Sequence, residues 1–596
     1  MKLNEFNKNL KKEYYDTFEE NVEIKPKRQS SFSFKLRYLL FALPALIVLL
    51  FVSIVLIDDA QVNAYNNNID DRMNSVLNNT SKDLEKVNSK NDLNSKLASV
   101  DFSPRESFLD SIVSIFEDKN GFMDNNFATG GDVADDAPAP GNPGMDAPTM
   151  DGNNSFETNI QTEGVDEADS AKCDGTYIYA IQDKGLYIYN LSGILLASQP
   201  TNATQLYLYN DKIVLLENSK TIIYSFNGSR LIDSKAFYHG RMVESRLVNN
   251  MLYLVVSDKL NVNTEDCSNL YYDGCINPYY VYSIISYDLD TDTAKNIKLV
   301  NSYNAILYAS KKHFYLASVN YINGTAVTFI SIVDIDLNPV GVVRLKGTVL
   351  NQFSLDEANG YLRVVSTDTS KTDNELNSIS IFDLASLQRV GYLNKGIGKS
   401  NQRIKSARFE GNICYVVTYL TQDPLYEIDC SDPTNPYIVD FYESPGYSSY
   451  LHTFEINDKS YLFGLGYTDF GEPKLSIYYN DEDLTQIGKD LVFGGYYSYI
   501  EKIEYTYECE TLVYNFISDH KALFVYNDNT YLYLGFAVGR EQYVIFKIDV
   551  TNEEMPISVY KEYKDLTYDY KKARGFLVND KFYIVTIDDI IIDDWK

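Results

Sequence analysis

The chain has 596 residues, with 83 acidic against 53 basic side chains and a formal net charge of −30 at pH 7. This excess of carboxylates argues against a nucleic-acid partner, because the phosphates would be repelled. The 51 Tyr and 30 Phe residues, against a single Trp, favour a protein built from β-strands, where aromatic side chains fit a pleated, half-buried surface.

An uncharged apolar run near the amino terminus, residues 38–57, is long enough to cross roughly 30 Å of hydrocarbon as a helix. Five basic residues precede it without an intervening acid, and Asp58 and Asp59 follow it directly. The positive-inside rule therefore predicts a cytoplasmic tail over residues 1–37, one transmembrane helix over 38–57, and an extracellular remainder. A cleaved signal peptide is the competing interpretation, with Val62-Asn63-Ala64 as a weak cleavage site.

Residues 58–156 are predicted to form an extracellular stalk and linker. Their first part is rich in Asn, Asp, Ser and Lys, a composition with too little apolar surface to fold alone. Residues 105–118 place apolar side chains on one helical face and predict a short amphipathic helix. Gly, Pro, Ala and Asp dominate the segment that follows, which is typical of a flexible linker. A domain over residues 157–596 completes the chain.

A hairpin pattern recurs through that last domain: a β-rich run, an acidic or Asn-containing turn, and a second β-rich run. Such a unit cannot bury both of its faces alone, so recurring copies indicate sheets that pack on one another. Nine inner strands but eight complete outer hairpins can be recognised. The pattern predicts an all-β fold, a β-propeller of about eight four-stranded blades, with seven or nine as alternatives. A strand from residues 158–161 is expected to close the last blade on its outer side.

Residues 157–181, ETNIQTEGVDEADSAKCDGTYIYAI, contain a specific motif. They resemble the opening signature of the bacterial and archaeal secreted β-propeller domain family, T-N-x-Q-x-x-G-V-D-E-A-D. Later segments fit the same family, among them ESRLV from Glu244, DHKAL from Asp519 and ARGFLV from Ala573. The resemblance implies a propeller in an exported or membrane-anchored protein and supplies no defined activity. Cys173 departs from the family pattern.

The acidic cluster within this signature is the candidate metal site. Asp166, Glu167 and Asp169 offer several hard oxygen ligands in one turn, and Ca²⁺ is the ion that such ligands favour. The spacing lacks the alternation of an EF-hand loop. The interpretation that we favour is structural, with the carboxylates accepting hydrogen bonds from backbone N–H groups where the ring closes.

Six cysteines in an exported domain raise the question of disulfides. Cys267 and Cys275 bracket a short insertion and are a candidate pair. Cys414 and Cys430 lie on successive strands of one predicted hairpin and form a second candidate pair. Six buried free thiols are the alternative.

No catalytic motif stands out. Ser448, Ser449 and His452 are close in sequence, but the G-x-S-x-G turn that carries a serine nucleophile is missing. The sequence therefore favours a membrane-anchored extracellular propeller that acts as a binding or scaffold module for a protein or a cell-surface polysaccharide, rather than an enzyme. A metal-dependent secreted hydrolase with carboxylates on the propeller axis is the alternative.

Overall fold

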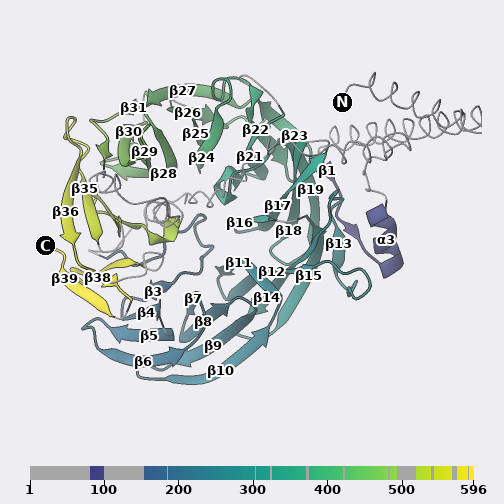
Figure 1. Cartoon of the computed structure of the whole chain (residues 1–596), viewed down its shortest axis with the longest axis horizontal. Helices are drawn as coiled ribbons and strands as arrows, with labels where there is room; N and C mark the ends of the chain where they lie inside the picture. The colour runs from purple at the N-terminus through teal and green to yellow at the C-terminus, as the bar shows by residue number, and fades with distance from the viewer. Residues whose placement is uncertain are drawn as a thin grey trace, which may run out of the picture. The chain divides into compact units, whose positions relative to one another are not determined.

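The repeated hairpins form nine sheets, with antiparallel strands apart from one short parallel pair, within the described part of the chain, arranged around a common centre as propeller blades (Figure 1). The computed structural model describes residues 81–98, 154–183, 185–302, 304–322, 325–370, 375–419, 423–480, 483–492, 519–538, 542–566, 573–587 and 589–596, all within one compact unit. The predicted β-propeller is confirmed, and the predicted count of about eight blades is corrected to nine.

The blades follow one another in chain order, each running from an inner to an outer strand. Blade 1 comprises β3 (Ala171–Cys173), β4 (Tyr177–Gln182), β5 (Gly185–Asn190) and β6 (Leu195–Pro200). Blade 2 comprises β7 (Gln205–Tyr209), β8 (Lys212–Glu217), β9 (Lys220–Phe226) and β10 (Leu231–Tyr238). Blade 3 comprises β11 (Arg241–Val248), β12 (Met251–Lys259), β14 (Tyr280–Asp288) and β15 (Ala294–Asn301). Blade 4 comprises β16 (Ile306–Ala309), β17 (His313–Ile322), β18 (Thr325–Asp334) and β19 (Pro339–Lys346). Blade 5 comprises β20 (Leu355–Ala358), β21 (Tyr361–Thr367), β22 (Asn377–Asp383) and β23 (Arg389–Leu393). Blade 6 comprises β24 (Arg403–Glu410), β25 (Ile413–Tyr419), β26 (Asp423–Asp429) and β27 (Tyr437–Ser444). Blade 7 comprises β28 (Tyr447–Ile456), β29 (Lys459–Tyr467) and β30 (Pro473–Tyr479) with the short β31 (Thr485–Gln486) and β32 (Leu491–Val492). Blade 8 comprises β33 (Phe524–Asn527), β34 (Leu532–Ala537), β35 (Tyr543–Ile548) and β36 (Ile557–Tyr563). Blade 9 comprises β37 (Gly575–Val578), β38 (Lys581–Val585) and β39 (Ile590–Asp594).

The turns explain why Asp and Asn recur at fixed places in the repeat. Between the first two strands of several blades, both turn residues have positive φ, as at Asn457 with Asp458 and at Asn579 with Asp580. Tight hairpins that match the strand twist require this conformation, and Asn and Asp tolerate it best. In the outer hairpins the Asp side chain caps the turn: Oδ1 of Asp334 accepts hydrogen bonds from two backbone N–H groups, at 3.0 and 2.7 Å. The acidic turns are therefore structural.

Apolar clusters between neighbouring blades close the ring. Blade 9 packs on blade 1 through Phe576 and Tyr583, which lie in one buried cluster with Ile178 and Tyr189. Within the described residues the last blade has three strands, and its inner strands provide this contact without a fourth. Ser155 exchanges two backbone hydrogen bonds with Leu577 on β37, the inner strand of blade 9. The expected outer closing strand from residues 158–161 is therefore wrong: the segment joins the ring on its inner side.

Residues 81–98, within the predicted stalk, lie on the outside of blades 3 and 4. They form β1 (Ser81–Lys82), which pairs with β19, then β2 (Glu85–Lys86), which pairs with β13 (Leu270–Tyr272), and α3 (Lys90–Ala98). The structure differs from a free stalk here because Val87 and Leu93 are fully buried with Leu270 and Val300. The added strands also cover sheet edges that would otherwise offer unpaired backbone groups.

The predicted transmembrane helix over residues 38–57 and the predicted amphipathic helix over 105–118 fall outside the described residues. Among the residues that are described, none of the helices has the length and apolar character needed to cross a bilayer.

Candidate functional site

The signature segment runs through the middle of the ring, where it contacts inner strands on several sides (Figure 1). Asp166 exchanges two backbone hydrogen bonds with Leu247 of β11, at 2.8 and 2.9 Å, and Asp169 exchanges two with Leu206 of β7, at 3.1 and 2.7 Å. The side chain of Asn159 donates to the hydroxyl of Tyr450 on β28 at 3.1 Å. Together with the pairing of Ser155, these contacts link blades 2, 3, 7 and 9 through one extended segment.

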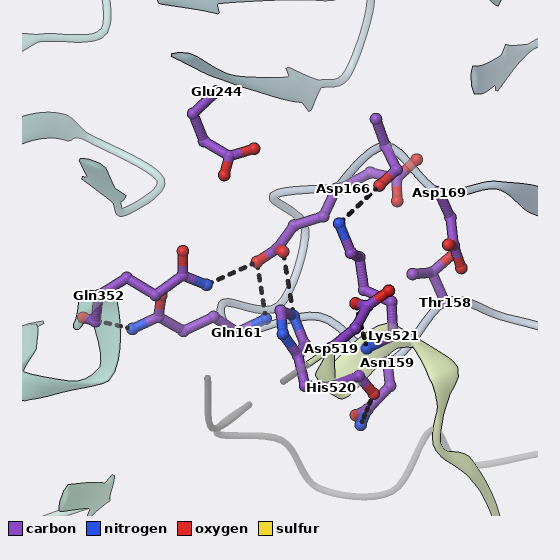
Figure 2. Close-up of polar contacts among 12 residues, drawn as sticks. Thr158, Asn159, Gln161, Asp166, Asp169, Glu244, Gln352, Asp519, His520 and Lys521 are labelled. Carbon is purple, nitrogen blue, oxygen red and sulfur yellow. Dashed lines mark hydrogen bonds and ion pairs between the residues drawn. The ribbon is translucent and has the colours of Figure 1, made fainter. Parts of the chain in front are cut away.

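Glu167 is enclosed within the ring, with 3% of its surface exposed. Its oxygens accept hydrogen bonds from the backbone N–H of Gln161 at 3.2 Å and from Nε2 of His520 at 3.0 Å (Figure 2). Nη2 of Arg246 lies 3.8 Å away. Burial opposes the charged form, but Arg246 and His520 outweigh burial and hold the pKa of Glu167 well below its usual range.

Asp169 forms the second buried ion pair, with Arg574, which directly precedes β37. Nε of Arg574 donates to both carboxylate oxygens, at 2.8 and 3.0 Å, and Nη2 lies 2.7 Å from Oδ1. The same Nη2 lies 2.6 Å from Asp519, the residue that caps η5 (His520–Ala522). Burial disfavours ionised Asp519, yet Arg574 and Lys521 lower the pKa of this carboxyl to about 2. A forked guanidinium is suited to such paired carboxylates.

Asp166, the third predicted ligand, pairs with a lysine of its own segment. Nζ of Lys172 lies 2.7 Å from Oδ1 of Asp166 and donates to Oγ1 of Thr158 at 2.8 Å. Asp174, which follows, is a turn cap: its Oδ1 accepts from the backbone N–H groups of Thr176 and Tyr177 at 2.8 and 2.7 Å. Each acidic residue of the signature thus has a partner within the protein.

The three predicted metal ligands do not converge on one point. Asp166 pairs with Lys172, Glu167 faces His520 and Arg246, and Asp169 pairs with Arg574. Within the described ranges no cluster of three or more His, Cys, Asp or Glu side chains is arranged to hold a metal ion. Calcium takes six to eight oxygen ligands at about 2.3–2.6 Å, and these oxygens face cationic N–H groups instead. The residues therefore do not fit Ca²⁺.

We expect a chelator to leave the thermal midpoint of the folded chain unchanged, because the signature carboxylates are neutralised by protein cations. Differential scanning calorimetry in EDTA and in excess Ca²⁺ measures this directly. A midpoint that falls in EDTA and returns with Ca²⁺ would contradict the assignment of these carboxylates to ion pairs.

Residues that sequence reasoning did not assign to the site provide the other half of these ion pairs. They are Arg246 in ESRLV, Asp519, His520 and Lys521 in DHKAL, and Arg574 in ARGFLV. A signal was present, since Arg246 lies within the strand-like run ESRLV and Arg574 directly precedes the apolar run of β37, and a buried cation requires a partner. What the sequence lacked was which acid each cation meets.

A cavity of about 50 Å³ adjoins the segment, lined by Thr158, Asp169, His452, Lys521 and Arg574 among others. This volume holds a few water molecules, whereas pockets for small-molecule ligands measure about 300–1,000 Å³. His452 lies within hydrogen-bond distance of the Tyr450 hydroxyl at 3.3 Å, and Ser449 donates to the carbonyl of Leu465 at 3.4 Å. These contacts of His452 and Ser449 therefore serve packing rather than a Ser–His nucleophile.

All five cysteines that the structure describes are free thiols, so neither predicted disulfide is present. Cys414 lies opposite Ile428 in the β25–β26 register, not opposite Cys430. Cys430 shares the apolar cluster of blades 5 and 6 with Cys414, and burial raises the pKa of Cys430 to about 12. Cys267 and Cys275 both belong to the cluster beneath β13, where Cys275 is fully buried. Cys509 lies outside the described residues.

Comparison with known proteins gives one family and several distant likenesses. A family model described as "Beta propeller domain" matches residues 156–486. An uncharacterized protein of Methanocaldococcus jannaschii is 28% identical over 431 residues, covering 55% of this chain and 67% of the relative. An uncharacterized protein of Archaeoglobus fulgidus is 26% identical over 441 residues, covering 55% of this chain and 69% of the relative.

The solved structures that match are more distant. Hsv2p of Kluyveromyces lactis matches with a TM-score of 0.32 and 11% identity, covering 59% of this chain and 95% of that one. Apo AztD of Citrobacter koseri matches with a TM-score of 0.29 and 11% identity, covering 70% and 91%. Scores this low say nothing about a ligand or partner of the present chain.

Proposed function

The chain belongs to the Beta propeller domain family, and on that basis we propose that it is a membrane-anchored extracellular module that binds a partner at the cell surface. The anchor would be the apolar run over residues 38–57, oriented by the basic residues before it. The partner would be a protein or a surface polysaccharide that meets the loops or the outer surface of the ring.

The pairing of the signature charges at the centre is the observation that carries this proposal. Glu167 and Asp169 have their cations within the protein, and the cavity beside them has room for a few water molecules. Catalysis would need such groups to face a substrate. Here they bind the segment to the inner strands, which favours a rigid binding scaffold over the alternative of a hydrolase with axial carboxylates.

Protease treatment of intact cells that express the full chain tests the location. We expect added protease to degrade the region after residue 58 and to leave a membrane-bound fragment that carries residues 1–57. Deletion of residues 38–57 is the matched control and should leave the chain inside the cell. A full-length chain that resists protease on intact cells and is degraded only after lysis would contradict an extracellular domain.

Cross-linking on the same cells tests binding. The full chain should retain a reproducible surface component after cross-linking, solubilisation and stringent washing, in excess of a control anchored by the same residues 1–57. Recovery of the chain alone, at the level of that control, would contradict a binding role.

A further inference from the structure

Arg344 on β19 of blade 4 is a buried cation without an anionic partner. It is 6% exposed, yet its guanidinium has no hydrogen bond or ion pair with any residue that the structure describes, and its Nε is wholly enclosed. Its guanidinium lies over the ring of Phe329, 4.7 Å from the ring centre. The other four arginines that are buried within the described residues each pair with a carboxylate: Arg246 with Glu244, Arg363 with Asp356, Arg408 with Glu410 and Arg574 with Asp169. A buried charge is costly unless it is paired, so Arg344 lacks a partner that its environment requires.

A second cation, Lys82 of β1, lies beside Arg344. Lys82 is opposite Val342 of β19 in the antiparallel register, and Arg344 is two residues from Val342, so Lys82 and Arg344 lie on the same face of the sheet. Both head groups lie over Gly274, in the loop after β13: a Cβ on this glycine would be 2.9 Å from Nη2 of Arg344 and 3.2 Å from Nζ of Lys82. The two nitrogens are therefore at most about 6 Å apart. Two cations thus meet above a backbone that carries no side chain.

The two acids whose charge acts on Arg344 already have other partners. Glu85 pairs with Lys82 and, at 2.6 Å, with Lys96. Asp273 is fully buried and accepts a hydrogen bond from a backbone N–H of its own loop at 2.8 Å and another from a serine hydroxyl of β18 at 3.4 Å. Burial lowers the pKa of Arg344, and these acids offset only part of that shift. An anion from outside the chain would complete the pairing.

We propose that Arg344 and Lys82 bind a phosphate group at the place where residues 81–98 dock on blades 3 and 4. A phosphate carries up to two negative charges, and its oxygens surround one centre, so one can accept from the guanidinium while another accepts from the ammonium. Charge-assisted hydrogen bonds of about 2.8 Å to such a group suit two nitrogens at this separation. The side chain of Lys82 is 33% exposed and connects the site to solvent.

The site goes beyond the proposed surface partner and does not depend on it. Because Lys82 belongs to residues 81–98 and Arg344 to the ring, a bound phosphate joins the two parts. The net charge of −30 repels anions from the chain as a whole, so binding would come from this local pair of cations. Free phosphate and a phosphate ester present the same chemistry to these side chains, and the experiment separates them.

Titration calorimetry on the full chain tests the proposal, with inorganic phosphate, glycerol 3-phosphate and acetate as probes at equal ionic strength in chloride. We expect phosphate to bind, and Arg344→Met and Lys82→Gln each to weaken its binding about tenfold. Lys395→Gln is the matched control, because Lys395 also pairs with a single glutamate, at 3.5 Å, but follows β23 of blade 5. Tighter binding of inorganic phosphate assigns the free ion, and tighter binding of glycerol 3-phosphate assigns an ester.

Hydrogen exchange and thermal unfolding supply readouts that a merely structural arginine would not give. Phosphate should slow amide exchange in residues 81–86 of the unchanged chain and leave it unaltered in Lys82→Gln, whose exposed side chain makes misfolding no concern. Without phosphate, Arg344→Met should keep or raise the thermal midpoint, because it removes an unpaired buried charge. The proposal is overturned by phosphate that binds no better than chloride, by acetate that binds as tightly as phosphate, by binding that both variants leave unchanged, or by a midpoint that falls in Arg344→Met.

Discussion

Arg574→Ala lowers the free energy of unfolding by about 3–5 kcal/mol, the loss typical of one partner removed from a buried ion pair. Arg574 is 3% exposed and bonds to Asp169 through Nε at 2.8 and 3.0 Å and through Nη2 at 2.7 Å. Its Nη2 also lies 2.6 Å from Asp519. The substitution leaves two carboxylates without their cation at the point where blade 9, the signature segment and η5 meet. Urea unfolding followed by circular dichroism measures the loss.

Two comparisons separate charge from geometry in this result. Arg574→Lys keeps the cation but removes the fork, and we expect an intermediate loss, about 1–3 kcal/mol. Arg389→Ala is the matched control: Arg389 is exposed, its guanidinium lies 4.1 Å from the ring centre of Tyr392, and its removal should cost less than about 1 kcal/mol. Equal stabilities for Arg574→Ala and Arg389→Ala would show that the central pair does not hold the ring.

The repeat pattern predicted most of the fold, and the reason for the missing blade is physical. Nine inner strands were recognised in the sequence, and each belongs to its own sheet. The lower prediction of about eight blades follows from the missing outer hairpin of the last unit. A fourth strand lies on the outside, however, while contact with the next blade depends on inner strands, where Phe576 and Tyr583 meet Ile178. A three-stranded unit is therefore sufficient to close the ring.

The sequence predicted where the signature carboxylates lie in the fold, but it did not predict which side chains pair with them. The segment with Asp166, Glu167 and Asp169 does lie where the ring closes, and each of these acids faces a cationic side chain of the protein. Two of their partners, His520 and Arg574, lie more than 350 residues further along the chain. Hydrophobic periodicity records which face of a strand is buried, but it carries no information about which buried charges meet across a ring. That pairing requires the three-dimensional structure.

Glu167→Gln should lower the free energy of unfolding by about 3 kcal/mol at pH 7, with the difference from the unchanged chain shrinking as the solution is acidified. The carboxylate is 3% exposed and faces Arg246 and His520, and Lys521 adds positive charge nearby. These cations hold the pKa of Glu167 below the value of about 4.3 that it has in an unfolded chain. Between those two pKa values the unfolded state binds more protons than the folded state, so stability falls as pH falls.

The stabilisation from Glu167 is therefore fully present above about pH 5 and is lost progressively below about pH 4. Asp519, with its pKa near 2, loses its contribution in the same direction and does so in both proteins. Glu163→Gln is the matched control from the same segment: its side chain is 73% exposed and lies 3.8 Å from Lys311, so it should change stability little at any pH. Urea unfolding from pH 7 to pH 3 makes the comparison. A difference between Glu167→Gln and the unchanged chain that stays constant over this range would mean that the folded ring does not lower the pKa of Glu167.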